Sequence, residues 1–124
     1  MGAAQLAACV GVRAFLSEYG SLSAADKALL EQWGVEHEEG GHTLERILAA
    51  NGVIKSPGIK HTNPVVQAVK AAGVPLMGEI DWATLYTEAP IVAVTGSNGK
   101  TTTATLCHHI ISGEKDCILA GNIG

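Results

Sequence analysis

A glycine-rich turn between an apolar run and a helix-like segment constrains this chain more than any other feature. The stretch reads IVAVTGSNGKTTT and covers residues 91–103. Residues 91–95 are mostly β-branched and apolar, which predicts a buried strand, and the segment that opens at Lys100 and Thr101 has the periodicity of a helix. A strand, a glycine turn, a lysine, a hydroxyl residue and a helix follow one another in this order in phosphate-binding loops.

The residue types of this turn suit a bound phosphate chain. Glycine lets backbone N–H groups curl around an anion without Cβ clashes, and a helix N-terminus adds partial positive charge. We expect Lys100 to reach the terminal phosphates and Thr101 to offer a hydroxyl to Mg²⁺. The predicted cradle comprises Gly96, Ser97, Asn98, Gly99, Lys100, Thr101 and Thr102. Val94 stands where the general motif has its first glycine, and such turns also occur without a ligand.

Charge and cysteine content exclude several classes of protein. The net charge of −4 with only eight lysines and arginines argues against a partner that is nucleic acid or an anionic membrane. No apolar run approaches the ~20 residues that span a bilayer. The three cysteines show no CxxC spacing, which indicates idle thiols in a reducing cytoplasm rather than disulfides or zinc. His108 and His109 are adjacent on the predicted helix and therefore point about 100° apart, so they cannot form one metal-binding face.

Apolar runs alternate with helical patterns of roughly ten residues along the whole chain. This alternation predicts an α/β fold, a Rossmann-like parallel sheet with flanking helices. The expected strands are residues 12–17, 35–38, 53–55 and 74–77, and the expected helices are residues 2–10, 24–33, 44–50, 63–72 and 80–86. Residues 88–90 look like a linker, so we expect a first domain over residues 1–88 and the start of a nucleotide-binding domain over residues 89–124. The second part should hold the loop, its helix to Ser112, and a strand at residues 117–120.

Both ends of the sequence are unusual for a doubly wound sheet. Such a sheet opens with a strand and a glycine turn, whereas this chain opens on what reads as the first helix. It stops in a loop after one helical crossover, and two strands with one helix cannot bury both faces of a sheet. We therefore expect a fragment, or a much shortened homologue, of a larger enzyme, and its unpaired sheet edges favour self-association.

Four motifs together resemble the Mur ligases, the ATP-dependent amide-forming enzymes of peptidoglycan precursor synthesis. They are GAAQLA at residues 2–7, KSPGI at residues 55–59, TGSNGKTTT at residues 95–103 and AGNIG at residues 120–124. Within the family, a Rossmann-like first domain that carries SPGI is similar to the branch that adds D-glutamate. The resemblance covers essentially the whole chain.

The resemblance implies a cytoplasmic reaction that uses ATP and Mg²⁺ in cell-wall biosynthesis. In such ligases ATP phosphorylates the carboxylate of UDP-N-acetylmuramoyl-L-alanine, and the amine of D-glutamate then displaces phosphate. Lys100 matches the lysine on the β- and γ-phosphates, Thr101 the hydroxyl near the metal, and Asn122 an asparagine beside the reacting groups and the substrate. The substrate pocket would also include Glu18, at the end of a predicted strand, together with Ser56, Pro57 and Gly58.

Other interpretations stay open at this point. The chain could be a non-catalytic module that binds nucleotides or UDP-sugars, since the second half of a ligase is absent from the sequence, or a piece of another Mur-type ligase. Without that second half, we expect the chain alone not to complete the reaction. Glu36, Glu38 and Glu39 are expected in a surface loop, and His42 beside them in a solvated turn.

Overall fold

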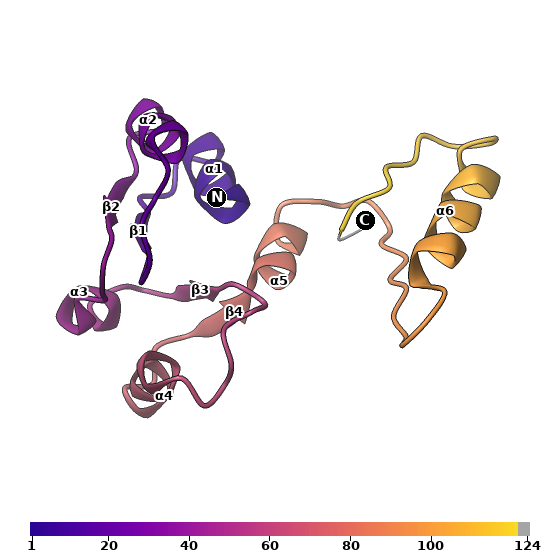
Figure 1. The fold of residues 1–124 in the computed structure, drawn as a ribbon. Coiled ribbons are helices and arrows are strands. Elements are labelled where there is room, and N and C mark those ends of the chain that lie inside the picture. Colours follow the sequence, from indigo (N-terminus) through magenta and orange to yellow (C-terminus); the bar gives the residue numbers. More distant parts are fainter. Residues whose placement is uncertain (122–124) are drawn as a thin grey trace. The chain divides into compact units, whose positions relative to one another are not determined.

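The computed structural model describes residues 1–121, which fall in two compact units, Met1–Glu88 and Ala89–Gly124 (Figure 1). Strands and helices alternate in the first unit, as predicted from the sequence. In chain order the elements of the first unit are α1 (Gly2–Cys9), β1 (Phe15–Ser17), α2 (Ala24–Gln32), β2 (Glu36–Glu38), α3 (Leu44–Leu48), β3 (Val53–Lys55), α4 (Pro64–Ala71), β4 (Leu76–Gly78) and α5 (Glu79–Thr84). The second unit contains α6 (Lys100–Ile111).

The helices of the first unit begin and end where local chemistry dictates. The Ser23 side chain accepts a hydrogen bond from the Asp26 amide at 3.0 Å, which caps α2. Asn63 caps α4 in the same way, and Pro64 follows at a position that needs no N–H donor. Just past the ends of these two helices, Gly34 and Gly73 have φ of 66° and 70°, a backbone conformation that favours glycine.

The strands of the first unit form two separate parallel pairs. β1 lies beside β2 and β3 lies beside β4, each pair over three residues. The prediction of short parallel strands with flanking helices is confirmed, and among residues 1–121 these strands form two pairs rather than a larger sheet. No strand among these residues joins one pair to the other, so both outer edges of each pair lack a strand partner there.

Helix packing connects the two pairs within the first unit. α1 packs against α5, and α5 also contacts β3 and β4, while α3 packs against α4. The buried apolar side chains of the described chain all belong to this unit: Ala4, Ala7, Leu30, Val35, Ile47, Val66 and Val69. Leu30 on α2 and Val69 on α4 are completely buried. The core of the first unit is therefore small and built from aliphatic residues.

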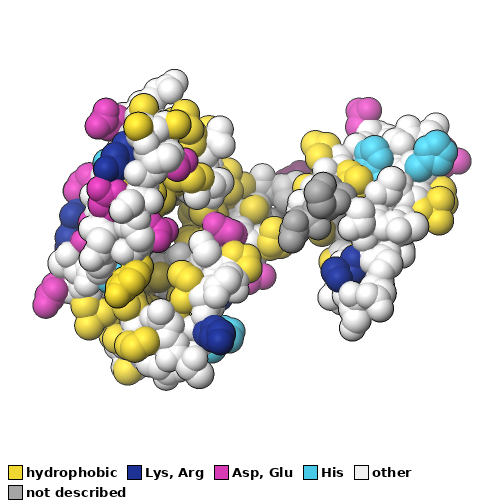
Figure 2. All heavy atoms as spheres, viewed as in Figure 1, with side chains coloured by type: hydrophobic (Ala, Val, Ile, Leu, Met, Phe, Trp, Pro, Cys, Tyr) yellow, Lys and Arg dark blue, Asp and Glu magenta, His cyan; other side chains and the backbone are white. Residues whose placement is uncertain are grey.

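In the second unit, the structure corrects two sequence predictions. Residues 91–95 and 117–120 have no regular secondary structure, although both were expected to be strands. Ile91, Val92 and Ile118 are 58%, 67% and 91% exposed. A strand is completed by hydrogen bonds to a neighbour, and the described part of this unit supplies no such neighbour. Hydrophobic side chains accordingly lie at its surface (Figure 2).

No helix within residues 1–121 combines the length and the apolar character that crossing a bilayer requires.

Candidate functional site

The predicted phosphate loop has the backbone conformation that its glycines permit. Gly96 has φ of 152° and Gly99 has φ of 75°, so both lie where a side chain would strain the backbone. Gly99 is the N-cap of α6, and the Thr103 amide donates to its carbonyl at 2.9 Å. The first amides of an α-helix have no acceptor inside the helix. The turn thus places N–H groups at a helix N-terminus, where an anion is favoured.

Lys100, the first residue of α6, folds back over this loop. Its Nζ donates to the carbonyl of Gly96 at 2.6 Å and to that of Ser97 at 3.3 Å. The side chain is exposed, so phosphate oxygens can replace these carbonyls as acceptors without breaking a buried contact. Thr101 and Thr102 follow in the first helical turn and are also exposed. Asn122, the other predicted catalytic residue, lies outside the described residues.

The predicted substrate turn follows directly after β3. Ser56, Pro57 and Gly58 form a tight turn that closes with a hydrogen bond from the Ile59 amide to the Ser56 carbonyl at 3.1 Å. The Lys55 ammonium donates to the carbonyls of Ser56 and Ile59 at 3.1 and 2.8 Å, which holds the turn from inside. In parallel α/β sheets, ligands bind outside the carboxyl ends of strands, and this turn occupies such a place.

Glu18 also lies at the carboxyl end of a strand, one residue beyond β1. Its Oε1 accepts a hydrogen bond from the Gly20 amide at 2.9 Å, and its own amide donates to the Glu38 carbonyl. The carboxylate is exposed and has one oxygen engaged by its own turn. The second oxygen is the one available to a ligand hydroxyl. The structure brings Glu18 to the same end of β1 as Ser17 and the loop after β2.

Glu38 of β2 takes part in a hydrogen-bonded cluster at the end of β1. Glu36 and Glu38 belong to β2, which confirms the strand expected over residues 35–38 and corrects the expectation of a surface loop for these two residues. The parallel register places Ser17 opposite Glu38, and the Ser17 hydroxyl donates to Glu38 Oε1 at 2.7 Å. Thr43 donates to the same carboxylate through its hydroxyl at 2.6 Å and its amide at 2.8 Å. These hydrogen bonds, those of Thr43 first, lower the pKa of Glu38 to about 2.

The same cluster fixes the tautomer of His42. Ser17 has one hydroxyl proton, and because the ionised Glu38 can only accept, that proton goes to Glu38. The 2.6 Å contact between Ser17 Oγ and His42 Nδ1 therefore has His42 as donor. The ring of Tyr19 lies 5.9 Å from that of His42. His42 is thus held by a hydrogen bond to Ser17 and is not free in a solvated turn. The spacing of the two residues in the sequence does not indicate this contact, because it depends on how β1 and β2 pair.

Three ion pairs form around β1 and β2 of the first unit. Glu36 bridges Arg13 at 2.7 Å and Arg46 at 2.6 Å, and Glu39 contacts Lys27 at 2.6 Å. These contacts lower the pKa of Glu36 and that of Glu39, the hydrogen bond from the basic partner being the largest cause in each case. Figure 2 shows acidic and basic side chains next to one another on this unit. The pairs are exposed, so we assign them little stability.

Comparisons with known proteins find similar sequences along this chain. A protein-family model described as the MurD N-terminal domain matches residues 6–65 of this chain. The UDP-N-acetylmuramoylalanine–D-glutamate ligase of Bacteroides fragilis is 44% identical over 99% of this chain, and that of Bacteroides thetaiotaomicron is 46% identical over the same share. The corresponding ligase of Chlorobaculum tepidum is 45% identical over the whole chain. The chain spans 28% of the length of each of these relatives.

Short parallel strands with flanking helices, in this order, define a mixed α/β domain of Rossmann-like type. The matches then point to one family: the chain is similar to the N-terminal portion of the D-glutamate-adding Mur ligases.

Proposed function

We propose that this chain is the N-terminal portion of an ATP-dependent ligase that joins D-glutamate to UDP-N-acetylmuramoyl-L-alanine in the cytoplasm. The observation that carries the proposal is the identity of 44–46% to D-glutamate ligases along 99% or more of the chain. The phosphate-loop geometry at Gly99 and Lys100 is consistent with it. On this proposal, residues 1–88 bind the UDP-linked substrate and residues 89–124 begin the ATP-binding domain.

On this proposal, several described residues have specific roles in the reaction. The amides at the start of α6 and the Lys100 ammonium would hold the β- and γ-phosphates and offset the charge on the transferred phosphoryl group. Thr101, whose hydroxyl is exposed at the helix start, is the residue that would face Mg²⁺, which neutralises phosphate charge when bound. The turn at Ser56 and the free oxygen of Glu18 would contact the UDP group. The acyl-phosphate route and the role of Asn122 are inferred from the family resemblance.

Replacing Lys100 by alanine tests the nucleotide site directly. We expect ATP–Mg²⁺ to bind the 124-residue chain about tenfold more weakly in Lys100→Ala, because one charge-assisted contact to phosphate is lost. Isothermal titration calorimetry measures the change. Lys115→Ala is the matched control, since Lys115 is an exposed lysine of the same unit outside the loop. Equal affinities in wild type and Lys100→Ala would refute the assignment.

The ligase activity needs a second test on the polypeptide of the complete reading frame. We expect phosphate release that depends on both D-glutamate and UDP-N-acetylmuramoyl-L-alanine, and its loss in Lys100→Ala. Binding of UDP compounds without turnover in that polypeptide would instead favour a non-catalytic binding module. Turnover with a different amino acid would assign the chain to another Mur-type ligase.

Unpaired strand edges give the isolated chain a route to self-association. β1 and β3 each pair with one strand among the described residues, and an open edge can pair with a second chain. We expect the apparent mass in light scattering to rise above 12.8 kDa as concentration increases. A constant monomer mass up to millimolar concentration would contradict this expectation.

A further inference from the structure

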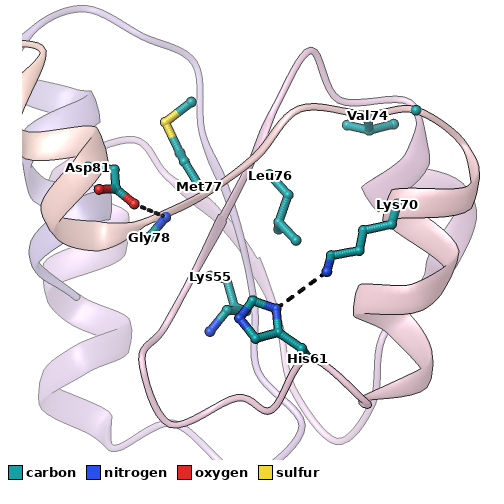
Figure 3. Close-up of a pocket in the computed structure, with 9 residues that line it drawn as sticks. Lys55, His61, Lys70, Val74, Leu76, Met77, Gly78 and Asp81 are labelled. Atoms are coloured by element: carbon teal, nitrogen blue, oxygen red, sulfur yellow. Dashed lines mark hydrogen bonds between the residues drawn. The ribbon is translucent and has the colours of Figure 1, made fainter.

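A basic pocket lies beside β3 and β4, apart from the Glu18 edge of the first unit. Its volume is about 490 Å³, and its walls include Lys55 of β3, His61 of the following loop, Lys70 of α4 and Asp81 of α5. Leu76 and Met77 of β4 form its apolar side (Figure 3). A cavity of this size matches those that hold small-molecule ligands.

The contact between Lys70 and His61 defines the hydrogen-bonding character of the pocket. Lys70 Nζ lies 3.5 Å from His61 Nδ1, and because an ammonium can only donate, Nδ1 is the acceptor. The proton of neutral His61 must then be on Nε2, which becomes a donor. The Gln67 side chain donates to the His61 carbonyl and holds this loop against α4. Lys70 keeps two further N–H donors that no contact within residues 1–121 uses.

Lys55 adds a third donor group on the same side. Two of its three N–H groups donate to the carbonyls of Ser56 and Ile59, which leaves one for a ligand. None of the ion pairs formed within residues 1–121 involves Lys55 or Lys70. Two lysines without an acidic partner are notable in a chain of net charge −4.

The one carboxylate of the pocket faces a different partner. Asp81 Oδ2 accepts a hydrogen bond from the Gly78 amide at 3.2 Å at the start of α5. Figure 3 shows Asp81 across the pocket from Lys55, His61 and Lys70, which gather at one end. That end therefore offers N–H donors from three side chains and no free acceptor among them. Such a set matches an oxyanion, whose oxygens only accept.

We propose that the Lys55–His61–Lys70 end of this pocket binds a phosphate group. The phosphate can be inorganic or part of a nucleotide diphosphate, and both present the same oxygens to these donors. The proposal does not require the ligase function, because it concerns residues 55–81 and a ligand that can be tested alone. It adds an anion site to the substrate turn predicted at Ser56–Gly58 and to the predicted phosphate loop.

The test is a titration of the isotope-labelled 124-residue chain with inorganic phosphate, followed by nuclear magnetic resonance. Sodium chloride at matched ionic strength provides the baseline. In wild type we expect saturable shifts of the His61 and Lys70 signals. In Lys70→Gln the affinity for phosphate should fall roughly threefold to tenfold, because one charge-assisted hydrogen bond is lost. These signals report this pocket even if phosphate also binds near Lys100. Lys70→Arg should retain binding.

Lys60→Gln is the matched control, because it removes the same charge from an exposed loop lysine that does not line the pocket. The proposal is overturned if the His61 signals do not shift saturably, or if Lys60→Gln weakens binding as much as Lys70→Gln. A parallel titration with UDP identifies the source. Tighter binding of UDP than phosphate through the same signals indicates a nucleotide diphosphate, and weaker binding indicates free phosphate. If the UDP-linked substrate does not bind at the predicted substrate turn, the proposed ligase function fails, but the phosphate titration of this pocket still stands by itself.

Discussion

Replacement of Leu30 by alanine is expected to lower the free energy of unfolding of the first unit by about 3 kcal/mol. Leu30 is completely buried and forms the centre of a cluster with Ala4 and Val35. Removing its side chain loses both the transfer free energy of the buried methyl groups and the dispersion contacts of the lining. Small domains have little stability to lose, so this change alone should leave a large unfolded fraction at 37 °C.

Urea denaturation followed by circular dichroism measures the effect, and Leu29→Ala is the control. Leu29 precedes Leu30 on α2 but is 39% exposed, so its replacement should cost under about 1 kcal/mol. Both changes remove the same atoms from the same helix. Equal losses of stability in the two variants would show that burial at residue 30 is not what stabilises this unit.

Sequence reasoning located the local features of the first unit because their causes are local. The side-chain cap at Ser23 and the glycines after α2 and α4 act within a few residues, and the structure confirms them. The strand at 53–55 is also found as predicted. How strands pair depends on contacts between distant segments, so the division into two parallel pairs is seen only in the structure.

In the phosphate-loop region, sequence reasoning predicted a strand that the structure does not contain. Residues 91–95 have the composition of a buried strand, yet Ile91 and Val92 are exposed, since β-propensity expresses packing against neighbours more than an intrinsic backbone preference. The helix at Lys100 was predicted correctly, because its glycine start and periodicity are local signals. The ligand roles of Lys100, Thr101 and Glu18 remain predictions.

Two side-chain clusters were invisible in the sequence. Ser17 meets Glu38 because the parallel register places them opposite each other, 21 positions apart in the chain. His61 meets Lys70 because a loop folds back on α4. A charge or hydroxyl pattern along the chain does not record either contact, so only the folded structure reveals them.

The pH dependence of stability should reveal the Glu38 cluster. Its pKa in the folded chain is lowered to about 2 from an ordinary value of 4.5, so the ionised carboxylate contributes its full stability above about pH 4.5. That contribution is lost as the pH falls from 4.5 toward 2. We expect Glu38→Gln to be less stable than wild type by about 1–2 kcal/mol at pH 7, after allowance for solvent screening. An amide offers one accepting oxygen where the carboxylate offers two, so the three donors of Ser17 and Thr43 cannot all be satisfied.

Thermal and urea unfolding from pH 7 to pH 2.5 measures this difference between the two proteins. The difference should shrink steadily below pH 4.5, because wild type loses its carboxylate hydrogen bonds while the variant has none to lose. Taking the difference cancels the pH dependence that Glu36 and Glu39 contribute to both proteins. Glu31→Gln, at an exposed position on α2, is the control and should track wild type. A difference between Glu38→Gln and wild type that stays constant down to pH 2.5 would mean that ionisation of Glu38 does not stabilise the fold.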